Sequence, residues 1–201
     1  MSLWLAPAPL VIASKSAVRR AVLEAAGIPL EVRPADIDER DIEARSSAAG
    51  PGEVAALLAR EKARAIAAVM PGRLVLGADQ TLALGARRFS KPVDRAAARE
   101  QLQALRGRTH ELHSAVAVVR DAEVLYDRVE VARLTMRTFA DEFLDRYIDT
   151  AGSAVTASVG AYQLERTGVH LFSRVEGDHF TVLGLPLLPL LGFLRNQGLV
   201  A

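Results

Sequence analysis

Short apolar runs alternate in this chain with longer stretches that have the periodicity of helices. Residues 10–13 (Leu-Val-Ile-Ala) and 74–78 (Leu-Val-Leu-Gly-Ala) are typical of buried strands. Residues 53–70 carry apolar side chains at spacings of three and four with charged residues between them, which predicts an amphipathic helix. Ser16 suits the N-cap of another helix, directly after the first strand. Because strands that alternate with helices pack as an α/β fold, we expect that fold class here.

The rest of the chain continues this alternation. We predict helices over residues 95–105, 141–148 and 186–195, two strands within residues 114–136 joined near Asp121, a strand over residues 168–172 and a loop at residues 50–52. Lys91 precedes Pro92 in another loop, either as a surface lysine or as a cation on a backbone that the proline restricts. His110 and His113 have the spacing of two metal ligands on one helix face, but the strand-like residues after them favour a structural role.

The composition is that of a globular protein. The chain has 201 residues, of which 50% are hydrophobic and 24% charged, so it is long enough for one domain or two closely packed lobes. We predict a single domain over residues 1–201. The formal net charge is +1, and the aromatic residues are one Trp, three Tyr and six Phe. Nucleic-acid-binding modules usually carry a basic excess and exposed aromatic side chains, so we expect no nucleic acid as a partner.

Cysteine is absent, which excludes disulfides, thiol nucleophiles and cysteine metal sites and suits a reducing compartment. Residues 1–10 lack the positive charge that opens a signal peptide. The apolar run at residues 180–194 is shorter than a bilayer span and contains Pro186 and Pro189. We therefore expect a cytoplasmic protein with no membrane partner.

Hydroxyls and cations cluster at the end of the first predicted strand. Ser14, Lys15 and Ser16 follow that strand, and Arg19 and Arg20 lie in the next helix. In open α/β sheets ligands bind beyond the carboxyl ends of the strands. Helix N–H groups, hydroxyls and positive side chains together suit a polyphosphate. The alternative is an ordinary N-cap with solvated charges on a surface helix.

Acidic residues form the second candidate site. Asp79 follows the strand at residues 74–78, and we place it at the C-terminal end of that strand, as an active-site carboxylate or as a cap for the next turn. We place an acidic cluster in a loop, where it could hold Mg²⁺ against phosphate oxygens or form a solvated turn; its members are Asp36, Asp38 and Glu39.

These pieces together resemble the Maf family of nucleoside triphosphate pyrophosphatases. The matching motifs occur in the family's order over nearly the whole chain. They are Leu10-Val-Ile-Ala-Ser-Lys-Ser16 with Arg19-Arg20, Glu31-Val32 with Asp36-Ile-Asp-Glu39, Leu58-Ala-Arg-Glu-Lys-Ala63, Gly77-Ala-Asp79, Ser90-Lys-Pro92, Gly107-Arg-Thr-His110 and Gly184-Leu-Pro186.

The resemblance implies an ITPase-like, two-lobed α/β fold with a mixed twisted sheet, flanking helices and a central cleft. The implied reaction is hydrolysis of a nucleoside triphosphate to the monophosphate and pyrophosphate, with a divalent cation such as Mg²⁺, Mn²⁺ or Co²⁺. Asp79 would be the base, and Glu39 and Asp79 would share the metal. Positive and hydroxyl side chains would bind the triphosphate and stabilise charge in the transition state: Ser14, Lys15, Ser16, Arg19, Lys62 and the catalytic Lys91.

Three further positions bear on the base of the nucleotide. Gln80 and Glu165 match the 7-methyl-GTP pyrophosphatase branch of the family, where the dTTP/UTP branch has threonine and glutamine. An ionised carboxylate at Glu165 only accepts hydrogen bonds, and the Watson–Crick edge of guanine offers N–H donors. The alternative for Glu165 is a surface charge beside Arg166. Val18 departs from that branch, which has tryptophan there. Valine cannot supply a cation–π contact to a methylated guanine, so the sequence favours a guanine-like base without fixing its methylation.

Two alternatives to this enzyme stay open from the residues. One is a dTTP/UTP pyrophosphatase. The other is a nucleotide-sensing regulator, associated with cell division, that binds without appreciable turnover. The presence of Asp79, Glu39 and Lys91 favours turnover over sensing. The oligomeric state is left open, with a homodimer among the options.

Overall fold

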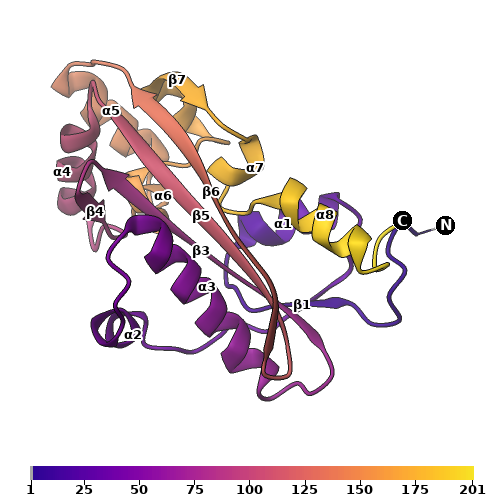
Figure 1. Cartoon of the computed structure of the whole chain (residues 1–201). Helices are drawn as coiled ribbons and strands as arrows, with labels where there is room; N and C mark the ends of the chain where they lie inside the picture. The colour runs from indigo at the N-terminus through magenta and orange to yellow at the C-terminus, as the bar shows by residue number, and fades with distance from the viewer. Residues whose placement is uncertain (1) are drawn as a thin grey trace. The chain divides into compact units, whose positions relative to one another are not determined.

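The structure is a computed structural model that describes residues 2–201 (Figure 1). Met1, the first residue of the predicted domain, lies outside the described residues. The chain divides into two compact units. The first contains the described residues up to Gln80, together with Ser114–Glu130 and His179–Ala201; the second contains Thr81–His113 and Val131–Asp178. The single domain over residues 1–201 stays a prediction.

One mixed sheet has the strand order β2-β1-β3-β5-β6-β7, with β4 paired to β3. The strands are β1 (Leu10–Ile12), β2 (Leu30–Val32), β3 (Leu74–Leu84), β4 (Arg87–Phe89), β5 (Thr109–Arg120), β6 (Glu123–Met136) and β7 (Phe172–Glu176). Strand β1 is parallel to β2 and β3, whereas β4 and β7 are antiparallel to their neighbours. The predicted α/β class with a mixed sheet and flanking helices is confirmed.

The predicted helices are present in the predicted order, and three short helices, at residues 39–45, 154–157 and 179–182, were not predicted. They are α1 (Ala17–Ala25), α2 (Glu39–Arg45), α3 (Pro51–Ala67), α4 (Arg95–Leu105), α5 (Asp141–Ala151), α6 (Ala154–Ala157), α7 (His179–Val182) and α8 (Leu187–Asn196), with 3₁₀ turns at Val159–Ala161 and Thr167–Leu171. Ser16 is the N-cap of α1, as predicted, and its hydroxyl accepts the backbone N–H of Arg19 at 3.3 Å. Within residues 2–201, none of the helices has the length and apolarity needed to cross a membrane.

The first unit places helices on both faces of its part of the sheet. Side chains alternate along a strand, so Leu10 and Ile12 face one way and Val11 the other. Leu10 and Ile12 join a buried cluster with residues of α1 and α8. On the opposite face, α3 packs through small side chains, which allow a close approach: Ala55, Ala59, Ala63 and Ala67.

The structure corrects the predicted position of Asp79. Strand β3 continues to Leu84, so Asp79 lies within the strand and not at its C-terminal end. The strand extends because Leu82 is buried and residues 82–84 pair with β4, a contact that residues 74–78 do not reveal. Strand β1 pairs with β3 only at Val75 and Leu76. Asp79 therefore lies beyond the last pair with β1, where β3 itself goes on.

Other boundaries also differ from the prediction. Strand β5 begins at Thr109 instead of residue 114, α3 ends at Ala67 instead of residue 70, and α5 continues to Ala151. Glu39 is the first residue of α2, capped by Asp38, and so is not in a loop. Helix α3 begins at Pro51 because Glu53 accepts the backbone N–H of Gly50 and completes its first turn. Residues 168–172 lie mainly in a 3₁₀ turn: a Cβ at Gly168 would be 2.3 Å from a backbone oxygen, so the chain bends tightly there and β7 begins only at Phe172.

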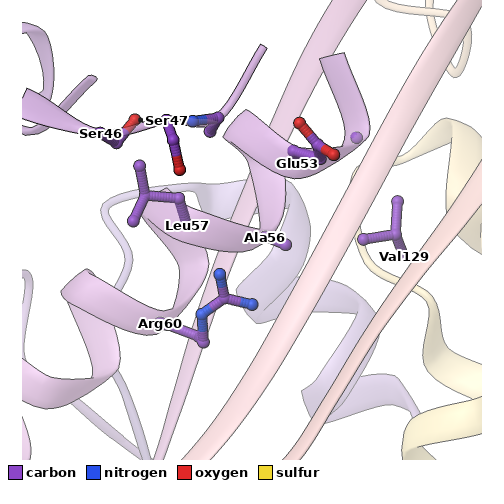
Figure 2. Close-up of a pocket in the computed structure, with 9 residues that line it drawn as sticks. Ser46, Ser47, Glu53, Ala56, Leu57, Arg60 and Val129 are labelled. Carbon is purple, nitrogen blue, oxygen red and sulfur yellow. Dashed lines mark hydrogen bonds between the residues drawn. The ribbon is translucent and has the colours of Figure 1, made fainter. Parts of the chain in front are cut away.

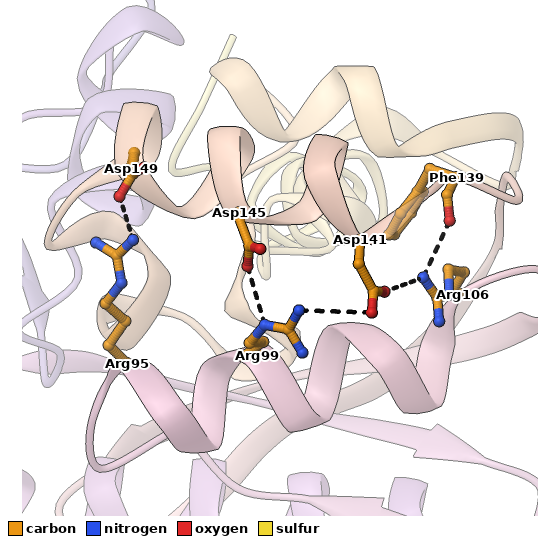
Figure 3. A network of polar contacts seen from close by, with 7 residues as sticks. All are labelled: Arg95, Arg99, Arg106, Phe139, Asp141, Asp145 and Asp149. Atoms are coloured by element: carbon orange, nitrogen blue, oxygen red, sulfur yellow. Dashed lines mark hydrogen bonds and ion pairs between the residues drawn. The ribbon is translucent and has the colours of Figure 1, made fainter.

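A ladder of ion pairs joins α4 to α5 in the second unit (Figure 3). Its rungs are Arg95 with Asp149, Arg99 with Asp145 and Asp141, and Arg106 with Asp141. The acidic members recur every four residues on α5, which places them on one face of that helix. Each pair is exposed to solvent and adds little alone, but the pairs together fix how these two helices face each other.

His110 is buried in the second unit among aromatic rings. Its Nε2 lies 2.7 Å from the Tyr162 hydroxyl, and its ring centroid is 5.9 Å from that of Phe172. No hydrogen-bond partner for its buried Nδ1 occurs among the described residues. Burial lowers the pKa of His110 to about 4. His110 and His113 both lie on β5, not on a helix, and the surroundings of His110 give it a structural role.

This burial predicts acid sensitivity. The folded-state pKa of His110 lies below its ordinary value, so its contribution to stability is complete above about pH 6.5 and is lost as the pH falls toward 4. Between pH 7 and pH 5 the wild type should lose about 2 kcal/mol that a His110→Gln variant does not lose. Urea unfolding of both proteins at the two pH values measures this difference, and an equal loss in both would contradict it.

Candidate active site

An ammonium group lies between two carboxylates in the first unit. Lys62 Nζ is 2.5 Å from Asp79 Oδ1 and 2.7 Å from Glu39 Oε1. The side chains of Lys62 and Asp79 are 13% and 12% exposed, whereas that of Glu39 is 49% exposed. Three residues that the sequence analysis selected, from α2, α3 and β3, are thus in direct contact. The shared lysine offsets the repulsion between the two acids.

The contact depends on how closely α3 lies on β3. Ala59 and Ala63 are fully buried against the sheet, and Gly77 presents no side chain to them. A Cβ at Gly77 would be 2.0 Å from the Ala59 carbonyl oxygen. Small residues on both elements therefore bring the backbones together, and Lys62 reaches Asp79 from the adjacent position on the helix.

Arg19 is fixed beside this group by oxygen acceptors. Its Nη1 donates to the Ala78 carbonyl at 2.8 Å and to Ser14 Oγ at 3.3 Å, and its Nε donates to the Gly184 carbonyl at 2.8 Å. Ser14 Oγ also accepts the backbone N–H of Ser16. The guanidinium therefore lies next to the residue that precedes Asp79, with Ser14 and Ser16 arranged at the start of α1.

Burial controls the protonation of this cluster. Burial raises the pKa of Asp79, while Lys62 and Arg19 oppose the rise. Burial also lowers the pKa of Arg19, and the negative charges of Asp79 and Glu39 oppose that change. The carboxylate and the two cations therefore stabilise one another's charged forms in a site that excludes most water.

Gln80 contacts protein acceptors on the other side of the strand. Its Nε2 lies 2.8 Å from Ser114 Oγ and within 3.2 Å of the carbonyl oxygens of Thr181 and Val182. The amide thus connects β3 to β5 and α7 within the first unit. These bonds give Gln80 a structural task, and its part in base recognition stays a prediction.

The remaining predicted residues have few constraints. Lys15 is exposed and Val18 is half-buried on α1. Lys91 is exposed in the loop between β4 and α4 of the second unit, and Glu165 is exposed in the turn at residues 164–166. Glu165 has no hydrogen bond or ion pair with any residue that the structure describes. The assignment of Lys91 and Glu165 to the site stays a prediction.

Asp79 and Glu39 are the carboxylates that could hold a divalent cation here. Asp79 and Glu39 both lie within 2.7 Å of a single atom, Lys62 Nζ, so they can converge on one ion. Over residues 2–201 no group of three His, Asp or Glu side chains is placed to hold a metal. Mg²⁺ commonly uses only one or two carboxylates and takes its other ligands from water and substrate phosphates. The donor set therefore suits a cation that arrives with a phosphate ligand.

Two hollows lie on the first unit. One, of about 570 Å³, is lined by residues 36–40 and so includes Glu39. The other, of about 520 Å³, lies on α3 and is lined by Ser46, Ser47, Glu53, Arg60 and Val129 among others (Figure 2). Arg60 lies about half a helical turn round α3 from Lys62, because residues are spaced by about 100°. The residues that line the second hollow include none of the predicted site residues.

Sequence reasoning missed several members of this cluster. The carbonyl oxygens of Ala78 and Gly184 hold Arg19, yet a backbone acceptor has no signature of its own in the sequence. The Gly184-Leu-Pro186 and Gly77-Ala-Asp79 motifs were the available signals, because they contain these two residues. Ser114, which binds Gln80, had no such signal.

Comparison with known proteins gives a consistent result. The family model described as Maf-like protein matches residues 9–197. A nucleoside triphosphate pyrophosphatase of Rhodopseudomonas palustris is 60% identical over 100% of both chains. A 7-methyl-GTP pyrophosphatase of Rhizobium etli is 50% identical over 95% of this chain and 97% of its own. The solved structure of a nucleoside-triphosphatase / dITP/XTP pyrophosphatase from Mycobacterium abscessus covers 96% of both chains at 16% identity, with a TM-score of 0.42 that is too low to support an inference. The match over nearly the whole chain and the identities of 50% and 60% show that this chain belongs to the Maf family.

Proposed function

We propose that this protein hydrolyses nucleoside triphosphates to the nucleoside monophosphate and pyrophosphate. Family membership makes it a hydrolase that acts on acid anhydrides. The observation that carries the proposal is the contact of Lys62 with both Asp79 and Glu39, next to the half-buried Arg19. Paired acids and converging cations are the groups that a metal-bound triphosphate requires.

We assign Asp79 the role of the base in this reaction. A water molecule attacks the α-phosphorus, the bond from that phosphorus to the bridging oxygen breaks, and pyrophosphate leaves with its electron pair. The carboxylate of Asp79 accepts the proton of the attacking water. Burial raises the pKa of Asp79, and the neighbouring charges of Lys62 and Arg19 oppose this rise and favour the ionised form that accepts a proton.

The cations stabilise the charge that develops on the phosphates. Arg19 is held by fixed oxygen acceptors and so needs little reorganisation to bind a phosphate oxygen. Lys62 can exchange one carboxylate contact for a phosphate contact. We assign Ser14, Lys15 and Ser16 to the phosphates at the start of α1.

Lys91 and the metal complete the proposal. Lys91, in the second unit, would supply a further positive charge to the triphosphate. Asp79 and Glu39 would hold a divalent cation, Mg²⁺, Mn²⁺ or Co²⁺, which when bound supplies neutralisation of phosphate charge.

We assign base selection to Glu165, with preference for a guanine-like base. Its exposed carboxylate has no partner among the described residues, so it can accept the N1–H and N2–H donors of guanine. The relative from Rhizobium etli is named for 7-methyl-GTP, which agrees with this preference. Val18 offers no aromatic face for a methylated, cationic base, so we leave methylation out of the assignment.

Glu165→Gln should shift the substrate preference toward pyrimidines. An amide can both donate to and accept from the edge of uracil, whereas the carboxylate repels its carbonyl oxygens. We expect the ratio of kcat/KM for GTP to that for UTP to fall on the order of tenfold, as for one charge-assisted hydrogen bond. Glu142→Gln, on α5 of the same unit, is the matched control and should leave the ratio unchanged. An unaltered ratio in Glu165→Gln would show that Glu165 does not read the base.

Pyrophosphate release tests the function itself. The purified chain is assayed with GTP, 7-methyl-GTP, UTP and dTTP in Mg²⁺, Mn²⁺ or Co²⁺. Release of pyrophosphate in equal amounts with the monophosphate supports the proposal. Tight nucleotide binding without release would instead identify the nucleotide-sensing regulator. Turnover confined to dTTP and UTP would retain the enzyme and reject the guanine-like preference.

A further inference from the structure

A strained turn precedes the segment that carries Glu165. Gly160 and Ala161 both have positive φ angles, +83° and +61°. This conformation costs an alanine about 1–2 kcal/mol because its Cβ approaches the following carbonyl oxygen. A Cβ at Gly160 would be 2.6 Å from Leu82 and 2.7 Å from the Tyr162 ring. The turn is therefore tightly enclosed as well as strained.

Side chains from other elements hold this turn in place. Tyr147 of α5 donates its hydroxyl hydrogen to the Ala161 carbonyl at 3.1 Å. Gln101 of α4 accepts the Gly160 N–H through Oε1 at 3.2 Å. Strain of this kind persists where the surroundings determine the conformation, and it occurs often at functional sites.

The other end of the Gln101 amide holds the loop at residues 90–94, called here the lysine loop because it carries Lys91. Gln101 Nε2 donates to the Ser90 carbonyl at 2.7 Å, and Ser90 directly precedes Lys91. One side chain thus fixes both the loop that carries Lys91 and the turn that leads to Glu165. All of these residues lie within the second unit.

Helix α4, which carries Gln101, is held in place by buried side chains and by ion pairs to α5. Leu102, the residue after Gln101, is fully buried, and so is Leu105 in the last turn. The ion-pair ladder of Figure 3 joins α4 to α5, the helix that also contributes Tyr147. Asp94 caps the N-terminus of α4 and so closes the lysine loop at its far end.

We propose that Gln101 is a positioning residue, which sets Lys91 for phosphate binding and the turn at Gly160–Ala161 for base selection. This inference rests on the proposed function, because it assigns Gln101 to the two residues of the second unit that the function uses. An amide suits the task because its two ends differ. The N–H₂ group donates to a carbonyl while the oxygen accepts an N–H. Methionine of similar length can do neither, and glutamate cannot donate when ionised.

The test uses Gln101→Met in the full chain. Loss of both bonds should lower kcat with GTP by about tenfold through misplacement of Lys91, and change KM less. The ratio of kcat/KM for GTP to that for UTP should also fall by about threefold or more, because the turn before Glu165 is no longer fixed. Gln103→Met is the matched control. Gln103 lies two positions further along α4 and therefore about 200° round the helix, so its replacement should change neither kcat nor the GTP to UTP ratio.

A double-mutant cycle separates positioning from a merely structural role. If Gln101 acts through Lys91, Gln101→Met should cost kcat less than about threefold in a Lys91→Ala background. An equal cost in both backgrounds, an unchanged GTP to UTP ratio, or full activity of Lys91→Ala would each overturn the inference while the pyrophosphatase function stands. Failure of the wild type to release pyrophosphate would overturn the proposed function, and the inference with it. Should Gln101→Met not fold, Gln101→Glu replaces it, since it retains the acceptor for the Gly160 N–H and loses the donor to Ser90.

Discussion

Asp79→Asn should lower the rate of pyrophosphate release by at least about a thousandfold. The amide has nearly the shape of the carboxylate but cannot take a proton from the attacking water and is a poor ligand for a divalent cation. Lys62 retains Glu39 as a partner at 2.7 Å, and Arg19 retains its carbonyl acceptors. The phosphate-binding cations therefore persist, and nucleotide affinity measured without a divalent cation should change by less than about fivefold, since only one of the site's charged groups is removed.

Two measurements separate these effects. Single-turnover hydrolysis of GTP reports the rate, and calorimetric titration with an analogue that carries an imido group between the α- and β-phosphates reports the affinity. Asp127→Asn is the matched control, because Asp127 pairs with Arg60 on the surface at 2.8 Å and is 48% exposed. Its loss should cost under about 1 kcal/mol of stability and no activity. Unchanged turnover in Asp79→Asn would remove Asp79 from the mechanism.

Most elements of the fold could be predicted because each one carries its own pattern. The Ser16 cap, the helix at 95–105 and the short buried strand at 10–13 are all encoded within a few residues. The end of β3 is not, since residues 82–84 stay extended by pairing with β4, which is a contact with another segment. The turn at 167–171 follows from close packing of Gly168 on the backbone of Gln163, which no periodicity reveals.

The candidate site, like the fold, could be predicted only in part from the sequence. Its charged residues could be selected from the sequence because motifs in a fixed order contain them, among them Lys62 and Asp79. That one lysine contacts both acids depends on how closely α3 approaches the sheet, and sequence spacing does not encode that distance. The fixation of Arg19 by two backbone carbonyls, and the hydrogen bonds of Gln101, depend in the same way on contacts between segments that are far apart in the sequence.

The approach of α3 to β3 can be tested through Gly77. Gly77→Ala should lower the stability by about 3 kcal/mol or more, because the new Cβ would lie 2.0 Å from the Ala59 oxygen and 2.8 Å from the Ala63 nitrogen. Both are backbone atoms of α3, so the whole helix has to move. Lys62 adjoins Ala63, and the same movement should separate its ammonium from Asp79 and lower the activity of the folded fraction as well.

Gly192→Ala is the matched control on α8. A Cβ there meets no atom within 4 Å, and helix propensity favours alanine over glycine by about 1 kcal/mol. Thermal unfolding should therefore show a fall in Tm of about 6–12 °C for Gly77→Ala and no fall for Gly192→Ala. Pyrophosphate release, measured well below both transitions, should fall only for Gly77→Ala. An unchanged Tm in Gly77→Ala would mean that α3 does not lie as close to β3 as the contact between Lys62 and Asp79 requires.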